Sequence, residues 1–536
     1  MVGFRFQVQK EGSGSAGVAI AIGLFVAFGG ILFGYDTGTI GGILGMDYWI
    51  KEFARDEHEN GRKFISSADK SLIVSILSVG TFFGALLSAQ VADYFGRKHG
   101  LMISSVVFAI GVIFQTAATE IIILVVGRLI AGLGVGLLSA QVPMYQSETS
   151  PKWIRGAIVG SYQLAITIGL LLASCANQGT HERQDTGSYR IPLSIQFVWA
   201  LILFFGMMLL PETPRFLIKR NRFDDAAKSL STLRRLPLDH PEIIAELNEI
   251  KANHEYEMSI GQTSYKKLLS NQSGFLRKRL LTGVGIQVFQ QLSGANFIFY
   301  YGTTFFQSAG IKNSFVVSLI TNCVNVVSTL PGLWLVDNWG RRNLLLFGAA
   351  GMFILGHWLL GTGEIFPLKA RAKGLSITTA ANWLLNWAIG YATPYMVDSG
   401  PGNANLGAKV FFVWGSFCAL SFAFVWAYVE SSIRSLPDYG TQLTNHASST
   451  IIVLSTKPKV LPWNKLTRYA KVLHAWNSPG FEPTVKFIEV AEEVQQQPYE
   501  GGRRPTLSEI EASAIRRKSS VGLPEKHEKI VESEIQ

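Results

Sequence analysis

The hexapeptide Asp93-Tyr-Phe-Gly-Arg-Lys98 is repeated later in the chain as Asp337-Asn-Trp-Gly-Arg-Arg342. Each copy follows a long apolar run, and both fit the pattern Asp-x-x-Gly-Arg followed by Lys or Arg. A single copy would be ordinary loop chemistry, because a glycine turn flanked by charges is common. Two copies at equivalent places predict that the chain contains two related halves.

The composition is that of a membrane protein. The chain has 536 residues, of which 48% are hydrophobic and only 16% are charged, and it contains 53 glycines. All three cysteines lie in apolar runs, which predicts neither a disulfide framework nor a zinc site. The net charge of +10 lies mainly in the segments between apolar runs. It suits an anionic lipid surface, and we expect no nucleic-acid partner.

Eleven apolar runs have about the 20-residue length needed to cross a bilayer. They begin near Val18, Ser71, Leu101, Ile122, Ala157, Ile191, Leu280, Phe315, Leu344, Leu375 and Val410. The segment 216–279, after the sixth run, holds twelve Lys and Arg, whereas 36–69 holds four against seven acidic residues. Because basic loops stay in the cytoplasm, we expect a cytoplasmic N-terminus. The first fifteen residues do not resemble a signal peptide, so the first span should direct insertion.

The basic segment after the sixth run contains two stretches with helical spacing of apolar residues, 223–236 and 241–258. The remaining face of each stretch is charged. This pattern is typical of amphipathic helices. We expect two short helices in the cytoplasm or at the membrane surface.

Further motifs accompany the repeated hexapeptide. They are FGYDTGTIGG (33–42), GRLIAGLGVG (127–136), PETPRFL (211–217), QQLSGANFIFYYG (290–302) and GEIFPLKARAKG (363–374). With them, residues from about 16 to 428 resemble the sugar porter family of the major facilitator superfamily, and within it the fungal hexose transporters. The resemblance implies two six-helix halves with a substrate site between them near the middle of the membrane.

The second half departs from this pattern. Asp93 and Glu148 are 55 residues apart, whereas Asp337 and Glu364 are 27 apart, which is 28 fewer. The family has a tenth span, with a Gly-Pro pair and a tryptophan, just before the GEIFP motif, and here the junction reads GMFILGHWLLGTGEIFP. We therefore expect the second half to lack about one span, which leaves 344–360 as the one crossing between these landmarks.

The tail also departs from the family. Residues 431–467 stand where fungal relatives continue with a Glu-Thr-Lys-Gly stretch, and 469–487 again resembles a family tail. One skipped exon and one retained intron, in the cell or in the gene model, would explain both departures. Sequencing of full-length transcripts would distinguish a real junction from an artefact.

The expected fold is an all-α membrane protein with a major facilitator fold of two six-helix halves, the second lacking about one span. Its expected parts are a cytoplasmic N-terminal segment (1–17), a six-span half (18–215), a cytoplasmic helical loop (216–279), a half with about five spans (280–429) and a cytoplasmic, mostly disordered tail (430–536). With one span fewer, either the tail lies outside or 344–360 re-enters on the cytoplasmic side. The basic residues Lys369, Arg371 and Lys373 oppose translocation and favour the second arrangement.

Amides within the spans are the candidate sugar ligands, because an amide offers a donor and an acceptor without net charge. Gln290, Gln291 and Asn296 lie on the seventh span. The resemblance adds five further residues to the candidate substrate site: Gln163, Asn325, Asn382, Trp383 and Asn386. The alternative is that these amides only join helices to one another.

Two buried charges are candidates for energy coupling. Asp36 lies near the outer end of the first span, and Arg128 lies at a compatible depth in the fourth. In the sugar symporters that these segments resemble, such an Asp takes up the proton, and a nearby Arg favours its carboxylate form. A purely structural ion pair is the alternative.

The charged motifs at the cytoplasmic ends of the spans resemble the latch of an alternating-access protein. Ten residues belong to this candidate gate: Asp93, Arg97, Glu148, Arg155, Glu212, Arg215, Asp337, Arg341, Glu364 and Arg371. Pairing between them would favour the outward-open state. The alternative is that they are solvated charges that set topology.

The resemblance implies uptake of glucose-type monosaccharides at the plasma membrane by alternating access, either facilitated or coupled to protons. The alternative is a sugar sensor that signals through its tail without transport. No P-loop, metal-ligand spacing or nucleophile motif is found, so we expect neither an enzyme nor a cofactor. The tail run 516–520 is a candidate kinase site, and the tail a candidate target of ubiquitin machinery. Lacking a span, this chain should transport poorly.

Overall fold

The computed structural model describes residues 17–57, 63–151, 154–260, 275–339, 347, 368–398 and 402–429. Contacts divide the chain into two units, the first made of Met1–Leu247 and Gln262–Ile433. All contacts discussed below belong to this first unit. The expected tail, the expected crossing at 344–360 apart from Phe347, and the basic run 516–520 lie outside the described residues.

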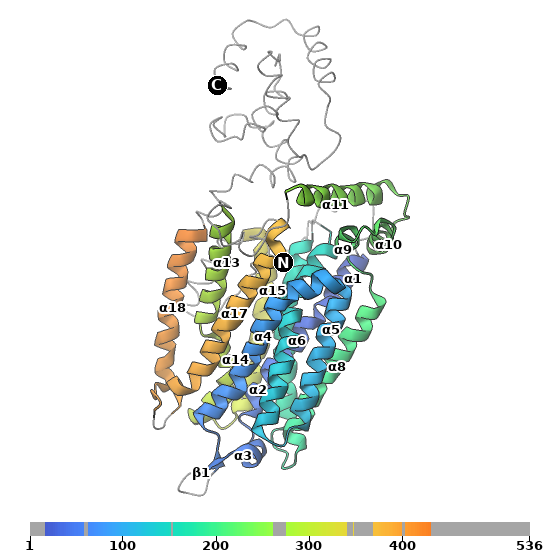
Figure 1. Ribbon diagram of the computed structural model, residues 1–536. Helices are drawn as coiled ribbons and strands as arrows, with labels where there is room; N and C mark the ends of the chain where they lie inside the picture. The colour runs from blue at the N-terminus through green and yellow to red at the C-terminus, as the bar shows by residue number, and fades with distance from the viewer. Residues whose placement is uncertain are drawn as a thin grey trace, which may run out of the picture. The chain divides into compact units, whose positions relative to one another are not determined.

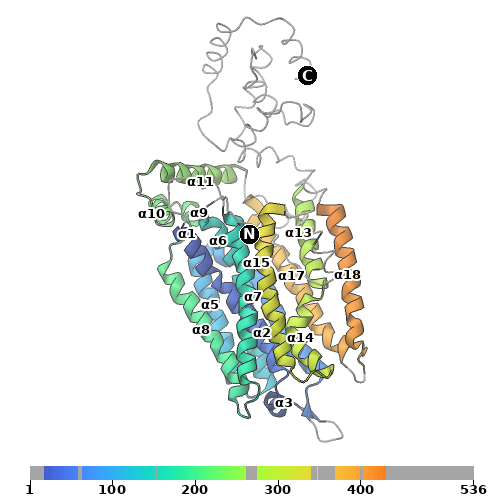
Figure 2. The same cartoon turned by 180° about the vertical axis from the view of Figure 1, so that it is seen from behind.

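The first half is a bundle of long apolar helices (Figures 1 and 2). Its helices are α1 (Gly17–Val26), α2 (Phe28–Ile43), α4 (Ser67–Phe95), α5 (Arg97–Ala117), α6 (Ile121–Thr149), α7 (Arg155–Thr180) and α8 (Gly187–Leu209). The helices α1 and α2 follow one another with only Ala27 between them and together form the first span. All six runs predicted in this half are therefore long enough and apolar enough to cross a membrane.

Glycines bring α4 and α6 into backbone contact. A Cβ on Gly80 or Gly84 of α4 would collide with the backbone oxygens of Leu129 or Leu133 on α6. A Cβ on Gly132 or Gly136 of α6 would likewise collide with the backbone of α4. Between membrane helices, where lipid is as apolar as the side chains, such small-residue contact is a main source of association. The GLGVG run of the sequence is thus a packing surface.

The second half contains α13 (Phe275–Leu292), α14 (Ala295–Ser308), α15 (Ser314–Trp339), α17 (Leu368–Val397) and α18 (Val410–Phe424), which a short π-helical turn extends to Val429. A 3-10 turn at Gly407–Lys409 precedes α18. Two of these helices, α15 and α18 with its extension, satisfy the length and hydropathy of a span. The run predicted from Leu375 corresponds to the C-terminal part of α17, from Leu375 to Val397.

The run predicted from Leu280 is two helices, not one. The chain leaves α13 after Leu292, and α14 begins at Ala295. Gly294 has φ 75, and a Cβ there would collide with the indole ring of Trp414 on α18. Only glycine adopts this backbone conformation without strain. The break lies within the QQLSGANF motif and separates Gln290 and Gln291 from Asn296.

The shortened stretch of the second half is visible in the element order. Between the end of α15 at Trp339 and the start of α17 at Leu368, only 28 residues remain. The corresponding landmarks of the first half enclose the two complete spans α5 and α6. Since one crossing takes about 20 residues, 28 residues hold one span but not two.

The two halves meet along several helix pairs in the first unit. Helix α17 packs against α4, α15 against α7, and α14 against α2. Figures 1 and 2 show these helices side by side from opposite directions. Every pair joins one helix of the first half to one of the second. A site between the halves is therefore built largely from α2, α4, α7, α14, α15 and α17.

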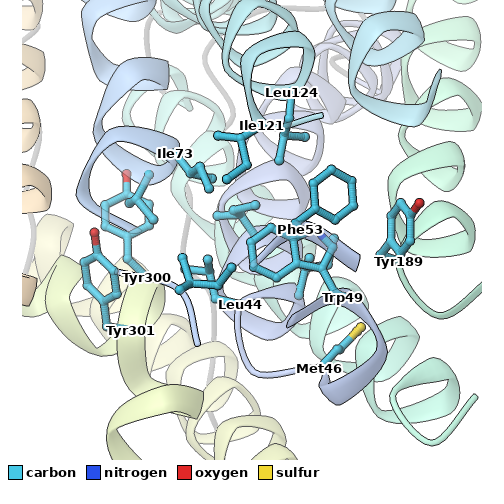
Figure 3. Packing of buried hydrophobic residues seen from close by; sticks show 14 of the residues in the cluster. Leu44, Met46, Trp49, Phe53, Ile73, Ile121, Leu124, Tyr189, Tyr300 and Tyr301 are labelled. Carbon is cyan, nitrogen blue, oxygen red and sulfur yellow. The ribbon is translucent and has the colours of Figure 1, made fainter. Parts of the chain in front are cut away.

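An apolar cluster closes one end of the bundle (Figure 3). The short helix α3 (Asp47–Phe53) supplies Trp49 and Phe53, which are stacked with their ring centres 5.3 Å apart. Phe53 also meets Tyr189 of α8 edge to face at 5.5 Å. Tyr300 and Tyr301 of α14 belong to the same buried cluster. The two-residue strands β1 (Asp56–Glu57) and β2 (Lys63–Phe64) form a small antiparallel ladder beyond α3.

Three short helices follow the sixth span: α9 (Pro214–Lys219), α10 (Phe223–Arg234) and α11 (Pro241–Ile260). The first unit includes α9, α10 and the start of α11, up to Leu247. The helices predicted at 223–236 and 241–258 are therefore present as α10 and α11, while their place in the cytoplasm or at the membrane surface stays a prediction. Arg235 ends α10 in the left-handed conformation, at φ 52. Arg234 then bonds both Glu246 of α11, at 2.7 Å, and the carbonyl of Thr149 at the end of α6, at 3.1 Å.

Candidate functional site

A cluster of amides lies where the broken seventh span meets α17. Asn382 donates from Nδ2 to Oε1 of Gln287, at 2.6 Å, and to Oε1 of Gln290, at 3.1 Å. Its Oδ1 accepts from Nε2 of Gln291 at 2.8 Å, and Oε1 of Gln291 accepts from Nδ2 of Asn296 at 2.7 Å. We call these five residues the amide cluster. Its hydrogen bonds connect α13, α14 and α17.

The helix break explains this geometry. Gln287, Gln290 and Gln291 are spaced i, i+3 and i+4 on α13, so they lie on one helix face. The turn at Gly294 lets α14 begin with Asn296 within bonding distance of Gln291. Gln287 is absent from the residues that the sequence predicted. Its position one turn before Gln291 was the signal that could have identified it.

Trp383, the residue after Asn382, contacts two helices of the first half. Its indole Nε1 donates to Oγ of Ser139 on α6 at 3.4 Å. Its ring meets Phe33 of α2 edge to face, with centroids 5.0 Å apart. Asn386, one turn further along α17, donates to the hydroxyl of Tyr300 at 3.0 Å. Four of the eight predicted substrate residues therefore lie in the amide cluster, and two more, Trp383 and Asn386, follow Asn382 on α17.

The other two predicted substrate residues are Gln163 and Asn325. Both side chains are half-buried, Gln163 on α7 and Asn325 on α15. The backbone oxygen of Asn325 accepts hydrogen bonds from the hydroxyls of Ser328 and Thr329. No hydrogen bond among the described residues joins either amide to the cluster. Their place in a substrate site stays a prediction.

Asp36 and Arg128 form a fully buried pair. Nη1 of Arg128 lies 3.8 Å from Oδ1 of Asp36, and both side chains are 0% exposed. Nε of Arg128 donates to the carbonyl of Ile73 at 2.7 Å. The side chains of Gln115 and Gln196 lie beside the carboxylate. The sequence predicted that Asp36 and Arg128 lie at compatible depths, and in the structure they do lie close together. A role in proton coupling stays a prediction.

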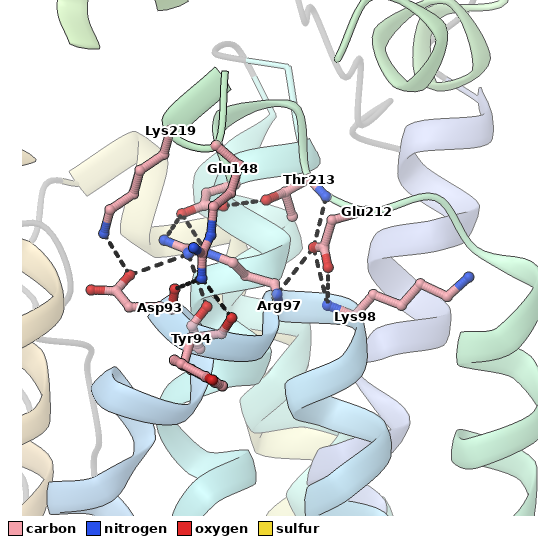
Figure 4. Close-up of polar contacts among 10 residues, drawn as sticks. Asp93, Tyr94, Arg97, Lys98, Glu148, Glu212, Thr213 and Lys219 are labelled. Carbon is pink, nitrogen blue, oxygen red and sulfur yellow. Dashed lines mark hydrogen bonds and ion pairs between the residues drawn. The ribbon is translucent and has the colours of Figure 1, made fainter. Parts of the chain in front are cut away.

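The repeated hexapeptide forms the centre of a charged cluster at the other end of the first half (Figure 4). Arg97 lies 3.3 Å from the carboxylate of Asp93 and 3.1 Å from that of Glu148. The backbone N–H groups of Arg97 and Lys98 donate to Glu212 at 3.0 and 3.1 Å. We call Asp93, Arg97, Glu148 and Glu212 the inner charge cluster. It joins α4, α5, α6 and the segment before α9.

Gly96, the glycine of the hexapeptide, occupies a position that a larger residue does not fit. Gly96 has φ 98, and a Cβ on it would collide with Oε2 of Glu212. Glycine therefore allows both the turn between α4 and α5 and the approach of the carboxylate. Burial raises the pKa of the Glu212 carboxyl, although hydrogen bonds from the N–H groups of Thr213 and Lys98 oppose the shift.

Residues outside the prediction complete this cluster. The hydroxyl of Thr213 donates to Glu148 at 2.6 Å, and Lys219 lies 2.9 Å from Asp93. Arg220 donates to the carbonyl of Tyr94 at 2.7 Å. Thr213 lies within the PETPRFL motif, so the motif itself was the available signal. Lys219 is the last residue of α9, and Arg220 follows it.

Only part of the predicted gate can be described. Arg155 begins α7, and Arg215 lies on α9 near the inner charge cluster. Asp337 and Arg371 lie within α15 and α17. Arg341 and Glu364 lie outside the described residues. The observed pairs lie within the first half, and pairing across the two halves stays a prediction.

A separate polar group joins the halves at the end where α3 lies. Lys70 of α4 pairs with Asp398, at the end of α17, at 3.0 Å. The hydroxyl of Ser67 also donates to Asp398, at 3.2 Å, and accepts from Asn403 at 3.0 Å. The Ser71 hydroxyl donates to the carbonyl of Tyr391 at 2.8 Å. No motif marked these residues in the sequence.

Comparison with known proteins supplies the family. The family model described as "Sugar (and other) transporter" matches residues 22–362 and 358–442. The chain belongs to the sugar transporter family of the major facilitator superfamily. This is a family of transporters, not of enzymes, and the chain is a multi-pass membrane protein. The two matched pieces meet at 358–362, inside the stretch where the second half is short by a span.

Several fungal proteins are similar over most of the chain. "Major facilitator-type transporter ecdD" of Aspergillus rugulosus is 52% identical, covering 79% of this chain and 87% of that protein. "Probable glucose transporter rco-3" of Neurospora crassa is 42% identical, covering 92% and 88%. "High glucose sensor RGT2" of Saccharomyces cerevisiae is 39% identical, covering 84% of this chain and 63% of that protein.

Solved structures agree with the fold. The xylose transporter XylE from E. coli, in a partially occluded inward-open conformation, is 25% identical with a TM-score of 0.62. The alignment covers 77% of this chain and 98% of that one. The major facilitator fold implied by the sequence motifs is therefore confirmed.

Replacing Arg97 by Ala should strongly destabilise the protein. The guanidinium is 8% exposed and neutralises carboxylates of Asp93 and Glu148. Removing one partner of a buried ion pair costs about 3–5 kcal/mol, because the other charge remains buried and unpaired. Thermal unfolding of the detergent-purified protein measures the effect. The matched control is Arg183→Ala, which breaks a pair that is half exposed at 2.8 Å. Equal unfolding temperatures for the two variants would contradict the structural role of Arg97.

Proposed function

We propose that this fold carries hexoses across the plasma membrane by alternating access, with its N-terminus in the cytoplasm. The observation that carries the proposal is the amide cluster. All five of its side chains are uncharged amides. Four come from α13 and α14, and each of these four bonds Asn382 of α17 or its partner Gln291. Uncharged amides can exchange these mutual hydrogen bonds for those of a neutral polyol. The names of the relatives, which include glucose and hexose transporters, support the same substrate class.

The position of the amide cluster is consistent with a substrate site that opens to one side of the membrane and then to the other. Trp383 lies between Asn382 and the first half, where it contacts Ser139 and Phe33. Closing or separating the halves would therefore move one wall of the site against the other. The Lys70–Asp398 pair closes the end away from the inner charge cluster. A transporter of this kind binds substrate near the middle of the membrane, between its halves.

The sensor alternative is not favoured over transport. Its support is the resemblance to RGT2, whose name describes a glucose sensor. Two relatives named as transporters are more similar, at 52% and 42% identity, and the second of them aligns with 92% of this chain. A sensor would bind hexose and signal without moving it. Labelled glucose uptake and signalling output therefore distinguish the two functions.

Transport should require the span that this chain lacks. A version with a tenth span restored between 339 and 368 should take up labelled glucose in cells that lack their own hexose transporters. The chain as given should show little or no uptake at equal surface expression, since five spans leave the cavity without one wall. Comparing the two uptake rates is the test. Robust uptake by the chain as given would contradict the need for the span, and no uptake by either would contradict the proposed function.

Replacing Gln291 by Ala should weaken hexose binding in the restored version. Its side chain is 5% exposed and bonds both Asn382 and Asn296, so it is fixed toward the cluster. Each lost hydrogen bond costs about 0.5–1.5 kcal/mol, roughly a 2- to 12-fold rise in the half-saturating glucose concentration. Gln184→Ala, on an exposed loop between α7 and α8, is the matched control. An unchanged affinity in Gln291→Ala would remove this residue from the site.

Asp36 is the proposed proton carrier. The carboxylate is fully buried beside Arg128, and it has no hydrogen-bond partner within 3.5 Å. In the restored version, adding sugar should therefore make the external medium more alkaline, and Asp36→Asn should abolish this change while sugar exchange continues. Asp185→Asn, in the exposed loop, is the control. Absence of alkalinisation before mutation would show a facilitator, in which Asp36 is only a structural partner.

A further inference from the structure

Pro394 interrupts the hydrogen-bond ladder of α17 close to the C-terminal end of that helix. A proline has no N–H group, so the carbonyl of Gly390, four residues earlier, lacks the donor that an α-helix normally supplies. In the structure the hydroxyl of Tyr301 on α14 donates to this carbonyl at 2.7 Å. Tyr301 is 4% exposed, so the bond is shielded from solvent. The Tyr301 hydroxyl therefore takes the place of the missing helix bond.

The carbonyls on either side of Gly390 also accept from side-chain hydroxyls. Thr393 donates to the carbonyl of Ile389 at 2.7 Å, within α17 itself. Ser71 of α4 donates to the carbonyl of Tyr391 at 2.8 Å. Proline, together with side chains that bond the freed carbonyls, is a recognised cause of helix bending. The point at which α17 can bend is therefore bonded to both halves of the protein, through α4 and α14.

Beyond Pro394, side-chain bonds hold the end of α17 to the start of α4. Asp398 accepts from Lys70 at 3.0 Å and from Ser67 at 3.2 Å. Asn403, in the loop after α17, donates to Ser67 at 3.0 Å. We call these four residues the outer latch, because in the proposed topology this end is extracellular. The side chains of Lys70 and Asp398 are 23% and 29% exposed, so water can compete for their pairing.

The loop after α17 is bonded back to the last turn of that helix. The N–H of Ala404 donates to the carbonyl of Tyr395 at 2.8 Å, and the N–H of Leu406 donates to that of Met396 at 2.8 Å. These bonds tie the loop to the residues beyond Pro394, not to those before it. The end of α17 and the loop can therefore move together, as one segment that begins at the proline.

This segment lies on the same helix as the amide cluster. Asn382, Asn386, Gly390, Pro394 and Asp398 follow one another at intervals of four residues and form one ridge along α17. Gly390 is eight residues from Asn382, or about 12 Å at 1.5 Å per residue. A bend at Pro394 would therefore move the outer latch while Asn382 keeps its bonds to the glutamines.

The bend point covers a buried part of α4. A Cβ on Gly390 would lie 3.7 Å from Ser75 and 3.8 Å from the side chain of Val74. Ser75 is 2% exposed and Val74 is 1% exposed. Helices α4 and α17 pack against each other along much of their length (Figure 1). Ser75 should therefore become accessible to water only when this part of α17 moves away from α4.

We propose that residues 394–398 of α17 and the loop 402–406 form a gate on the outer side of the amide cluster. The gate is hinged at Pro394 and held closed by the outer latch, and the structure shows its closed state. Opening breaks the Lys70–Asp398 pair and bends α17 away from α4. The Tyr301 hydroxyl stabilises the closed hinge through Gly390. The proposal rests on the proposed function only for the identity of the solute that passes, a hexose.

Water access to Ser75→Cys tests the gate in the full chain, purified into lipid nanodiscs. The background variant carries Cys175→Ser, Cys323→Ser and Cys418→Ser, which removes the three native thiols. A charged methanethiosulfonate that does not enter lipid labels the introduced thiol, and the labelling rate reports the open fraction. No sugar is added, so the result does not depend on which solute the protein carries.

Breaking the latch should speed the labelling. Lys70→Met and Asp398→Asn should each raise the rate about 2- to 5-fold, as expected for loss of a partly exposed ion pair. Lys312→Met removes an exposed charge between α14 and α15 and is the matched control, with no expected change. The charge reversal Lys70→Asp with Asp398→Lys should return the rate to within about 2-fold of the background, because the two charges attract again.

The hinge is tested by combining two substitutions. Tyr301→Phe should raise the labelling rate about 2- to 10-fold, because the carbonyl of Gly390 loses its donor. In a Pro394→Ala background the same Tyr301→Phe change should alter the rate less than about 2-fold, because the substituted residue supplies the missing N–H. This dependence of one substitution on the other is specific to the proline position.

Three outcomes would overturn the proposal. Equal labelling rates for Lys70→Met, Asp398→Asn and Lys312→Met would refute the latch. A charge reversal that labels as fast as the single variants would show that attraction between Lys70 and Asp398 does not hold the segment. An effect of Tyr301→Phe that is the same with and without Pro394→Ala would refute the hinge. Glucose uptake tests the proposed function separately: a gate that behaves as predicted in a protein without uptake would refute hexose transport alone.

Discussion

A polar side chain buried among membrane helices has no bulk water to bond, so it must find a partner in the protein or in a ligand. This constraint organises the chain. In the inner charge cluster, Arg97 pairs with the carboxylates of Asp93 and Glu148. This cluster joins four segments of the first half. In the middle, Asn382 meets three glutamines. At Asn177 and Asn322, by contrast, the side-chain oxygens have no hydrogen-bond partner in the described part of the chain.

The inner charge cluster, the amide cluster and the Asp36–Arg128 pair differ in how many of their polar atoms have hydrogen-bond or ionic partners. This difference corresponds to their proposed roles. The inner charge cluster is fully paired and turns on a glycine that no other residue could replace without a collision. The amide cluster is paired internally but uncharged, so its bonds can be exchanged for those of a sugar. The Asp36–Arg128 pair is fully buried at 3.8 Å with little hydrogen bonding. An ion pair held this loosely is suited to changing its protonation.

Sequence patterns identified features that lie within one helix or one turn. The repeated hexapeptide predicted the two halves, and Gln290, Gln291 and Asn382 proved to be neighbours. Patterns could not identify contacts that depend on how helices far apart in sequence pack. Lys70 and Asp398 are 328 positions apart, and Asn322 and Ser174 are 148 apart. Nothing in their local surroundings marks them. The break at Gly294 was also missed, because the apolar run continues on both sides of it.

The central claim is that the amide cluster binds hexose at the junction of the halves. An experimental density map of the chain in lipid nanodiscs with saturating glucose tests it most directly. The account predicts density for one hexose in contact with Gln291 and Asn382, with the Asn382 bonds to the glutamines partly replaced by bonds to the sugar. A map at the same glucose concentration with intact bonds between Asn382 and all three glutamines, and no sugar beside them, would contradict it.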